Sequence, residues 1–300
     1  MQALVLSGGG NRGPLQVGAI RALFAHGVAP QMIVGSSAGA LNGVFLAIEP
    51  NMAGADRVAE MWREAGRRRV IHNGPLQTFW QLLRGKNHVM DNAGMAAFIR
   101  SVLPPNVRVF GDLKLPFYVT IAHWMTRALY VYGDDPQGDL TQALVTSTAV
   151  PGYFPPTWHN GEAFVDGGLV SNVPAQIAVA RGATELWVID LAYSTDAPRV
   201  PGNSLSIIRH AVYPALYREA LLELESVAFR PGIKLHHIPI YDYQDVSLGD
   251  FAEIENMLEL GAQAANKYLE RPEPNIVRHP RKFMADELPP GPPGSKPFVG

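Results

Sequence analysis

A serine with small neighbours stands at position 37, at the centre of a G-x-S-x-G pattern formed with Gly35 and Gly39. The apolar run 32–34 precedes the pattern, and a helix-forming stretch follows it. This order of strand, sharp turn and helix is the setting of a nucleophile elbow, in which small neighbours let the backbone take a strained bend and expose the hydroxyl. The pattern predicts that Ser37 attacks an acyl carbonyl.

A serine nucleophile needs a group that accepts its proton, and two sets of residues qualify. Asp166 ends a short apolar run and precedes Gly167 and Gly168, a turn that lets a carboxylate approach another backbone closely. With an ordinary pKa of ~3.9, an aspartate acts as a base only if it is buried or bonded directly to the serine. Alternatively, Asp190 and His237 complete a triad in the chain order of α/β-hydrolases, although those proteins usually place several strands before the elbow. Spacing alone leaves both sets open.

A glycine-rich loop, residues 8–13, follows the first apolar run and precedes a helix that begins at Pro14. It matches G-x-G-x-x-G, a pattern typical of dinucleotide-binding sites. Such a site also needs an acidic residue about 20 residues further on, and none lies between Gly13 and Glu49. The second feature expected of a nucleotide-dependent oxidoreductase is therefore absent from the sequence. What remains is a set of backbone N–H groups at a helix N-terminus, which can stabilise a developing oxyanion.

Strand-like runs alternate with helical stretches through most of the chain. This alternation predicts an α/β fold with a largely parallel sheet covered on both faces, with ligands at the carboxyl ends of the strands. Helical patterns without a strand fill residues 53–105, which we interpret as a helical insertion. Periodic apolar residues end near 270, and the last thirty residues hold eight prolines. We therefore expect one packed domain over 1–270 and a Pro-rich tail over 271–300.

The amino-acid composition argues against several classes of function. The 300 residues are 47% hydrophobic, and a formal charge of −2 gives no field to attract nucleic acid. The absence of cysteine excludes thiol catalysis, disulfides and Cys-ligated metal sites. The longest apolar stretch, 38–48, is shorter than the roughly 18 to 20 residues that cross a bilayer, and no signal sequence is visible. We expect a cytoplasmic protein, in peripheral contact with a membrane at most.

Apolar bulk gathers in the helical insertion. Its large apolar residues are Trp62, Phe79, Trp80, Leu82, Leu83, Met90, Met95 and Phe98. Such residues at helical spacing favour ordinary packing, with a lipid-facing entrance as the alternative. Three consecutive arginines, 67–69, allow a contact with anionic lipid head groups, but a solvated helix end explains them better.

Together these motifs resemble the patatin-like phospholipase family. The resemblance covers roughly residues 3–191, and two positions depart from the family pattern without removing a catalytic group: Ser7 stands where aspartate is common, and Ser36 where threonine is common. The four matching blocks are residues 7–13, 35–39, 150–156 and 166–174.

The resemblance implies a three-layer α/β/α fold with a mostly parallel central sheet and a helical insertion. It implies a Ser–Asp dyad without histidine, with Ser37 as nucleophile and Asp166 as general base, and it requires no metal or cofactor. The backbone amides implied for the oxyanion hole are those of Gly8, Gly9, Gly10 and Asn11. The residues implied in supporting positions are Arg12, Gly35, Gly39, Gly167 and Gly168.

The expected activity is that of a serine lipid acyl hydrolase of the phospholipase A or lysophospholipase type, which cleaves fatty-acyl esters through an acyl-enzyme. The expected partners are phospholipid, lysophospholipid or another fatty-acyl ester. Two alternatives stay open: an esterase of the α/β-hydrolase type with a Ser37–Asp190–His237 triad, and a non-catalytic lipid-binding protein on the same fold.

Overall fold

A computed structural model describes residues 1–68, 70, 90–191, 204–243, 246 and 249–279, and of residues 204–215 only the backbone. Phe79, Trp80, Leu82, Leu83 and most of the Pro-rich tail lie outside the described residues.

An 8-stranded sheet forms the middle of the described structure, in the order β5-β6-β3-β2-β1-β7-β8, with β4 also paired to β3. Strands β3, β2, β1, β7 and β8 run parallel, while β4, β5 and β6 pair in antiparallel fashion. The strands are β1 (Gln2–Leu6), β2 (Met32–Gly35), β3 (Phe117–His123), β4 (Leu129–Tyr132), β5 (Thr157–His159), β6 (Glu162–Asp166), β7 (Glu185–Asp190) and β8 (Lys234–Pro239). The expected α/β fold with a mostly parallel sheet is therefore confirmed.

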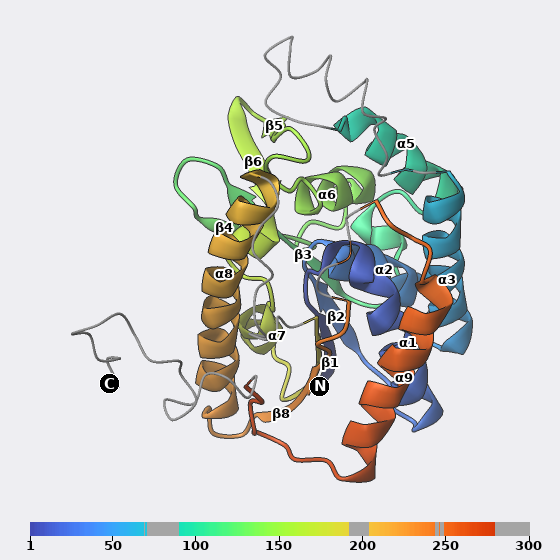
Figure 1. Cartoon of the computed structure of the whole chain (residues 1–300), viewed down its shortest axis with the longest axis vertical. Coiled ribbons are helices and arrows are strands. Elements are labelled where there is room, and N and C mark those ends of the chain that lie inside the picture. Colours follow the sequence, from blue (N-terminus) through green and yellow to red (C-terminus); the bar gives the residue numbers. More distant parts are fainter. Residues whose placement is uncertain (69, 71–89, 192–203, 244–245, 247–248, 280–300) are drawn as a thin grey trace, which may run out of the picture.

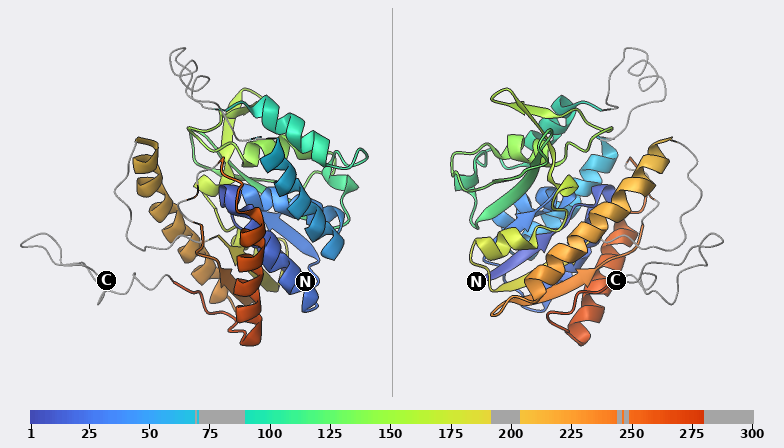
Figure 2. Two further views of the ribbon diagram at one scale, coloured as in Figure 1. Left: turned by 45° about the vertical axis from the view of Figure 1, so that its right-hand side comes forward. Right: turned by 90° about the vertical axis from the view of Figure 1, so that its left-hand side faces the viewer.

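Helices cover both faces of the sheet (Figures 1 and 2). On one face lie α1, α2, α3, α5, α6 and α9, and on the other lie α7 and α8. The longer helices are α1 (Gly13–Ala25), α2 (Ala38–Ile48), α3 (Met52–Arg67), α5 (Asn92–Val102), α8 (Ser204–Ala228) and α9 (Ile254–Glu270). The shorter elements are α6 (Leu140–Ser147), α7 (Ala175–Ala180) and the 3₁₀ turns η1 (Gly10–Arg12), η2 (Phe110–Asp112) and η3 (Gly167–Leu169).

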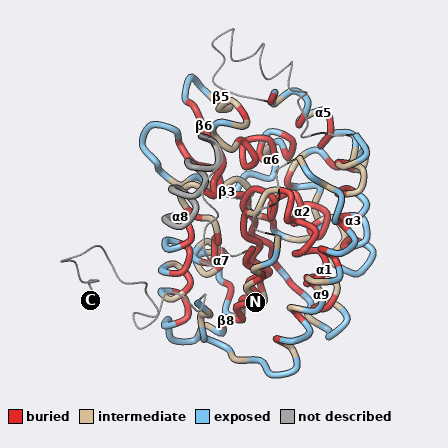
Figure 3. The backbone as a smooth tube through the Cα atoms, in the orientation of Figure 1, coloured by how far each residue is buried: buried red, intermediate tan, exposed pale blue. Residues whose placement is uncertain are grey.

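Strand β1 shows why two hydrophobic cores form. Its side chains alternate, so that Leu4 and Leu6 pack into the core under α1 and α2, while Ala3 and Val5 pack into the core under α7 and α8. A central parallel strand covered on both faces is apolar throughout, as β1 is. Figure 3 shows this burial concentrated in the central strands and in α1 and α2. The glycine loop and the elbow thus begin from deeply buried strands.

Helix α9 packs mainly against another helix and also contacts the edge strand β8. It runs along α1, and both helices lie on the same side of the sheet (Figure 1). Its apolar stripe, which includes Ile254, Leu258 and Ala265, joins the same core as α1 and α3. In the described part of the chain, no helix combines the length and the hydrophobicity that crossing a bilayer requires.

Candidate active site

Ser37 occupies the turn between β2 and α2, where its backbone has φ 51 and ψ −120. A positive φ is strained for a residue with a side chain, and strain of this kind is typical of a nucleophile elbow. Both flanking glycines are needed: a Cβ at Gly39 would lie 2.3 Å from the carbonyl oxygen of Leu6, and one at Gly35 would lie 2.6 Å from that of Gly39. The Ser37 N–H donates to the Oγ of Ser147 over 2.9 Å, which fixes the bend from the far side.

The register of the sheet brings Asp166 level with Ser37. Gly35 at the end of β2 pairs with Val119, and Ile121, two residues further along β3, pairs with Asp166. Ser37 stands two residues beyond Gly35, so the serine and the aspartate emerge at the same height on β2 and β6, the two strands that flank β3. This register joins residues far apart in the sequence, so no local sequence pattern predicts it.

Asp166 is buried, and burial raises the pKa of its carboxyl to about 7. The Ser37 hydroxyl and the N–H of Gly168, which donates to Oδ1 over 2.7 Å, lower that pKa, but by less than burial raises it. The other carboxyl oxygen, Oδ2, is buried and accepts no hydrogen bond of standard geometry from the described residues. The Ser37 hydroxyl is thus close enough to the Asp166 carboxyl to affect its pKa.

The glycine loop lies beside Ser37 and Asp166, and the backbone N–H groups of residues 8–11 differ in their hydrogen bonding. The N–H of Gly8 donates to the carbonyl oxygen of Asn172 over 3.0 Å and is therefore already committed. Within the described chain, the N–H groups of Gly9 and Gly10 have no such acceptor, and Gly10 lines the same pocket as Ser37. The side-chain amide of Asn11 donates to the carbonyl oxygen of Asp250 over 2.7 Å.

Arg12 braces the loop from inside the protein. Its guanidinium is buried and donates to the carbonyl oxygen of Leu191 over 2.8 Å, directly after β7. Ser7, at the position where the family pattern favours aspartate, has its Oγ accept the N–H of Leu191 over 2.8 Å. Both ends of the loop are thus tied to the same residue beyond β7.

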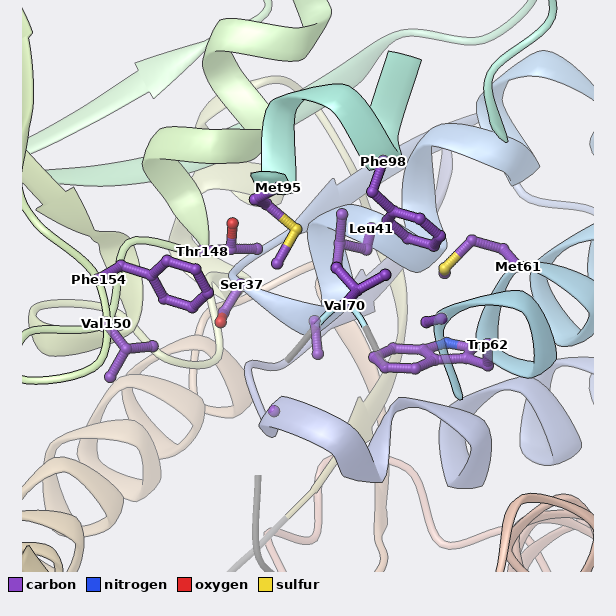
Figure 4. Close-up of a pocket in the computed structure, with 13 residues that line it drawn as sticks. Ser37, Leu41, Met61, Trp62, Val70, Met95, Phe98, Thr148, Val150 and Phe154 are labelled. Atoms are coloured by element: carbon purple, nitrogen blue, oxygen red, sulfur yellow. The ribbon is translucent and has the colours of Figure 1, made fainter. Parts of the chain in front are cut away.

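An apolar pocket opens beside the Ser37 hydroxyl (Figure 4). Helices α2, α3 and α5 and the segment after α6 supply its walls. The lining side chains include Leu41, Met61, Trp62, Ala65, Val70, Met95, Phe98, Thr148, Val150 and Phe154. Trp62, Met95 and Phe98 are therefore both core residues, as favoured from the sequence, and pocket walls.

The alternative triad is not assembled. Asp190 and His237 do meet, with Oδ2 and Nε2 3.3 Å apart and both side chains fully buried. They lie on the face of the sheet that carries Val188 and α8, whereas the pocket of Ser37 lies on the other face. The second ring nitrogen of His237 accepts the N–H of Arg278 over 3.0 Å. This histidine therefore cannot take a proton from Ser37.

The arginines at the end of α3 are neutralised by neighbouring carboxylates. Arg67 pairs with Glu60 and Glu64, and Arg68 pairs with Glu64, all at the protein surface. Arg69 lies outside the described residues. Arg67 and Arg68 therefore fit the interpretation that these arginines lie at a solvated helix end. Among the described residues, no three His, Asp or Glu side chains gather as metal ligands.

Sequence reasoning missed Ser147 and Asn172 as individual contributors. Ser147 stands 110 positions from the N–H that it accepts, and no spacing rule joins the two. Asn172 does fall inside a block that was singled out, residues 166–174, but its contact with the glycine loop depends on how the chain folds back over β1.

Comparison with known proteins finds a family and several relatives of this chain. The family model described as patatin-like phospholipase matches residues 4–179. The mouse protein named patatin-like phospholipase domain-containing protein 7 is 31% identical over 191 residues, and lysophospholipase NTE1 of Mycosarcoma maydis is 28% identical over 212 residues. These matches cover 63% and 68% of this chain but only 13% and 10% of the relatives, so the chain spans a small part of their length.

The fold also has a solved counterpart. The crystal structure of VipD from Legionella pneumophila superposes with a TM-score of 0.51, covering 90% of this chain and 66% of that one, at 14% sequence identity. At this identity the likeness concerns the fold alone.

Proposed function

This chain belongs to the patatin-like phospholipase family, a family of carboxylic ester hydrolases, and from that premise we propose that it is a serine lipid acyl hydrolase with Ser37 as nucleophile and Asp166 as general base. The observation that carries the proposal is the meeting of a strained serine and a buried aspartate of raised pKa at the wall of an apolar pocket. A pKa of about 7 makes Asp166 a far stronger base than an exposed aspartate, while leaving much of it ionised near neutral pH.

The reaction proceeds in two acyl transfers. Ser37 Oγ attacks the ester carbonyl carbon as its proton passes to Asp166, and the carbonyl oxygen becomes an oxyanion. When the C–O bond to the leaving alcohol breaks, Asp166 returns the proton to that alcohol and the acyl group stays on Ser37. Water then attacks the acyl-enzyme, giving its proton to Asp166, and the released Ser37 Oγ takes the proton back as the fatty acid leaves.

Oxyanion stabilisation falls to the glycine loop. The amides of Gly9 and Gly10, with that of Asn11 next to them, are the donors we assign to the hole, because the amide of Gly8 already has an acceptor. Preorganised donors of this kind are worth about 10²–10³ in kcat each. Gly8 is thereby assigned to holding the loop in place.

The substrate class follows from the pocket and the relatives. The described walls beside Ser37 are almost wholly apolar, which suits a hydrocarbon chain and offers few groups to bind a polar acid. Phospholipid, lysophospholipid or another fatty-acyl ester fits this site. The name lysophospholipase carried by a relative makes a lysophospholipid the first substrate to test.

An active-site serine probe tests the proposal. The wild-type chain should be labelled by a fluorophosphonate and should hydrolyse p-nitrophenyl butyrate and lysophosphatidylcholine, and Ser37→Ala should lose both labelling and hydrolysis. Ser36→Ala is the matched control, because Ser36 Oγ is fully buried and lies outside the pocket lining. A wild-type chain that binds lipid but is never labelled would instead support a non-catalytic lipid-binding protein.

A further inference from the structure

The apolar pocket is asymmetric about Ser37. In Figure 4, Phe154 and Val150 stand on one side of the hydroxyl, and Val70, Trp62 and Met61 on the other. The residues Gly10, Val70 and Val150 are partly exposed, whereas Met61 and Trp62 are buried, with exposures of 4% and 3%. The pocket lining is therefore partly exposed beside Ser37 and at Val70, whereas the wall that Met61 and Trp62 form is buried.

The indole of Trp62 is held in place rather than merely packed. Its Nε1–H donates to the Oδ1 of Asn42 over 2.7 Å, and Asn42 is fully buried. One edge of the ring lies against Gly13, where a Cβ would come within 2.0 Å of Cζ2. The ring of Phe251 lies with its centroid 6.3 Å from that of Trp62. A tryptophan fixed by a buried hydrogen bond and by packing has little freedom to swing aside.

The amide of Asn42 belongs to a longer buried network. Its Nδ2 donates to the carbonyl oxygen of Gly13 over 3.1 Å and to the Oε1 of Gln16 over 2.9 Å. Gln16 in turn donates to the carbonyl oxygen of Ser7 over 2.9 Å. Asn42 and Gln16 therefore hold the residues that flank the glycine loop, and Asn42 also holds the buried wall of the pocket. A shift of Trp62 would leave a buried amide oxygen unpaired, which opposes the movement.

We propose that Trp62 sets the length of acyl chain that this site accepts, and that Asn42 is the positioning residue that keeps the indole across the end of the pocket. This inference rests on the proposed function. The acyl chain enters past Ser37 and runs along the wall that Leu41 belongs to, toward Trp62, so a chain that reaches the indole can extend no further in that direction. The substrate class is thereby narrowed to esters whose acyl chain ends at Trp62, and longer chains must leave part of their length outside the pocket.

A chain-length series tests the inference. For p-nitrophenyl butyrate, octanoate, dodecanoate and hexadecanoate, Trp62→Ala should raise the ratio of kcat/KM for dodecanoate to that for butyrate by about tenfold or more, because one methylene in an apolar pocket is worth about 10-fold or more. Asn42→Ala should shift the ratio in the same direction but by less, since the indole stays but loses its hydrogen bond. Trp158→Ala is the matched control: this tryptophan is 69% exposed and does not line the pocket, so the ratio should not change.

A ratio of rates is insensitive to the fraction of active enzyme, and a second variant guards against poor folding. Trp62→Leu keeps an apolar side chain in the core and should also raise the ratio of kcat/KM for dodecanoate to that for butyrate. Its melting temperature should be recorded alongside. The rates at which alkyl fluorophosphonates of increasing chain length label the serine should follow the same order in each variant.

The outcomes separate the two proposals. If Ser37→Ala abolishes hydrolysis but Trp62→Ala and Trp62→Leu keep the wild-type chain-length profile, Trp62 does not limit the chain and only this inference is wrong. If the wild-type chain hydrolyses no ester and its serine is never labelled, the proposed function is wrong and the inference falls with it.

Discussion

Gly8 and Asn172 join the two halves of the candidate site. The N–H of Gly8 donates to the carbonyl oxygen of Asn172 over 3.0 Å, and a Cβ at Gly8 would come within 2.4 Å of the Oδ1 of the same asparagine. The glycine loop and the segment that follows Asp166 therefore touch through a position where only a hydrogen atom fits. The distance between the proposed oxyanion donors and the proposed base depends on this contact.

Substituting Gly8 by alanine should slow turnover by about ten- to a hundredfold, because the new methyl displaces the Asn172 side chain and also lies 3.2 Å from the Ser37 Cβ. Steady-state kinetics with p-nitrophenyl butyrate measures the loss. Gly94→Ala is the control, since a Cβ at Gly94 meets no heavy atom within 4 Å. Equal kinetics for the two variants would show that the loop tolerates the methyl group.

Asp166→Asn should reduce kcat by at least about 10³-fold, whereas His237→Gln should keep most of the activity, because His237 and Asp190 lie on the opposite face of the sheet from the pocket. Hydrolysis rates should be compared at equal folded fraction, judged by circular dichroism, because His237 is fully buried. The reverse pattern, an inactive His237→Gln and an active Asp166→Asn, would restore the triad.

The rate should depend on pH through the base. Asp166 accepts a proton only when ionised, and its pKa is raised to about 7, so kcat/KM should fall about tenfold per pH unit well below 7 and level off above it. A pH–rate profile from pH 5 to about 9 locates this limb. A limb near the ordinary aspartate value of ~3.9 would mean that substrate-free Asp166 is not desolvated as described.

The same group should make stability depend on pH in the opposite sense. A carboxyl whose folded pKa lies above its unfolded value binds a proton more tightly when folded, so it destabilises the fold as pH rises from about 4 to about 7. Asp166→Asn removes the buried charge and should raise the free energy of unfolding relative to wild type more at pH 8 than at pH 5. Between pH 5 and pH 8 the difference is of the order of 2–4 kcal/mol. Urea unfolding of both proteins at the two pH values measures it.

Ser147 should matter although it is distant in sequence. Ser147→Ala removes the acceptor of the Ser37 N–H and leaves a buried donor unpaired, which costs about 1–3 kcal/mol of stability and loosens the elbow. We expect a lower melting temperature together with a lower kcat. Ser226→Ala, at an exposed position on α8, should change stability by less than about 0.5 kcal/mol. A Ser147→Ala variant as stable and active as that control would contradict this role.

The features that the sequence determined by itself are local ones. A strained turn after a strand needs small residues beside the serine, and a loop that approaches other backbone needs glycine, so the elbow at Ser37 and the loop over 8–13 could be recognised from neighbouring residues alone. Alternating strands and helices likewise predicted the parallel sheet. The periodic apolar residues before 270 do not say what α9 packs against, because an apolar stripe does not specify which surface covers it.

Only the tertiary structure decides whether Asp166 or the pair Asp190–His237 lies beside Ser37. Both lay after strands at suitable distances along the chain, and what separates them is the sheet register that sets Asp166 level with Ser37 and the pleat that turns His237 to the opposite face. Strand order and register arise from pairings between residues far apart in sequence. The same is true of the burial that raises the pKa of Asp166 and of the hydrogen bond that locks Trp62, since each depends on side chains that only the packed fold brings together.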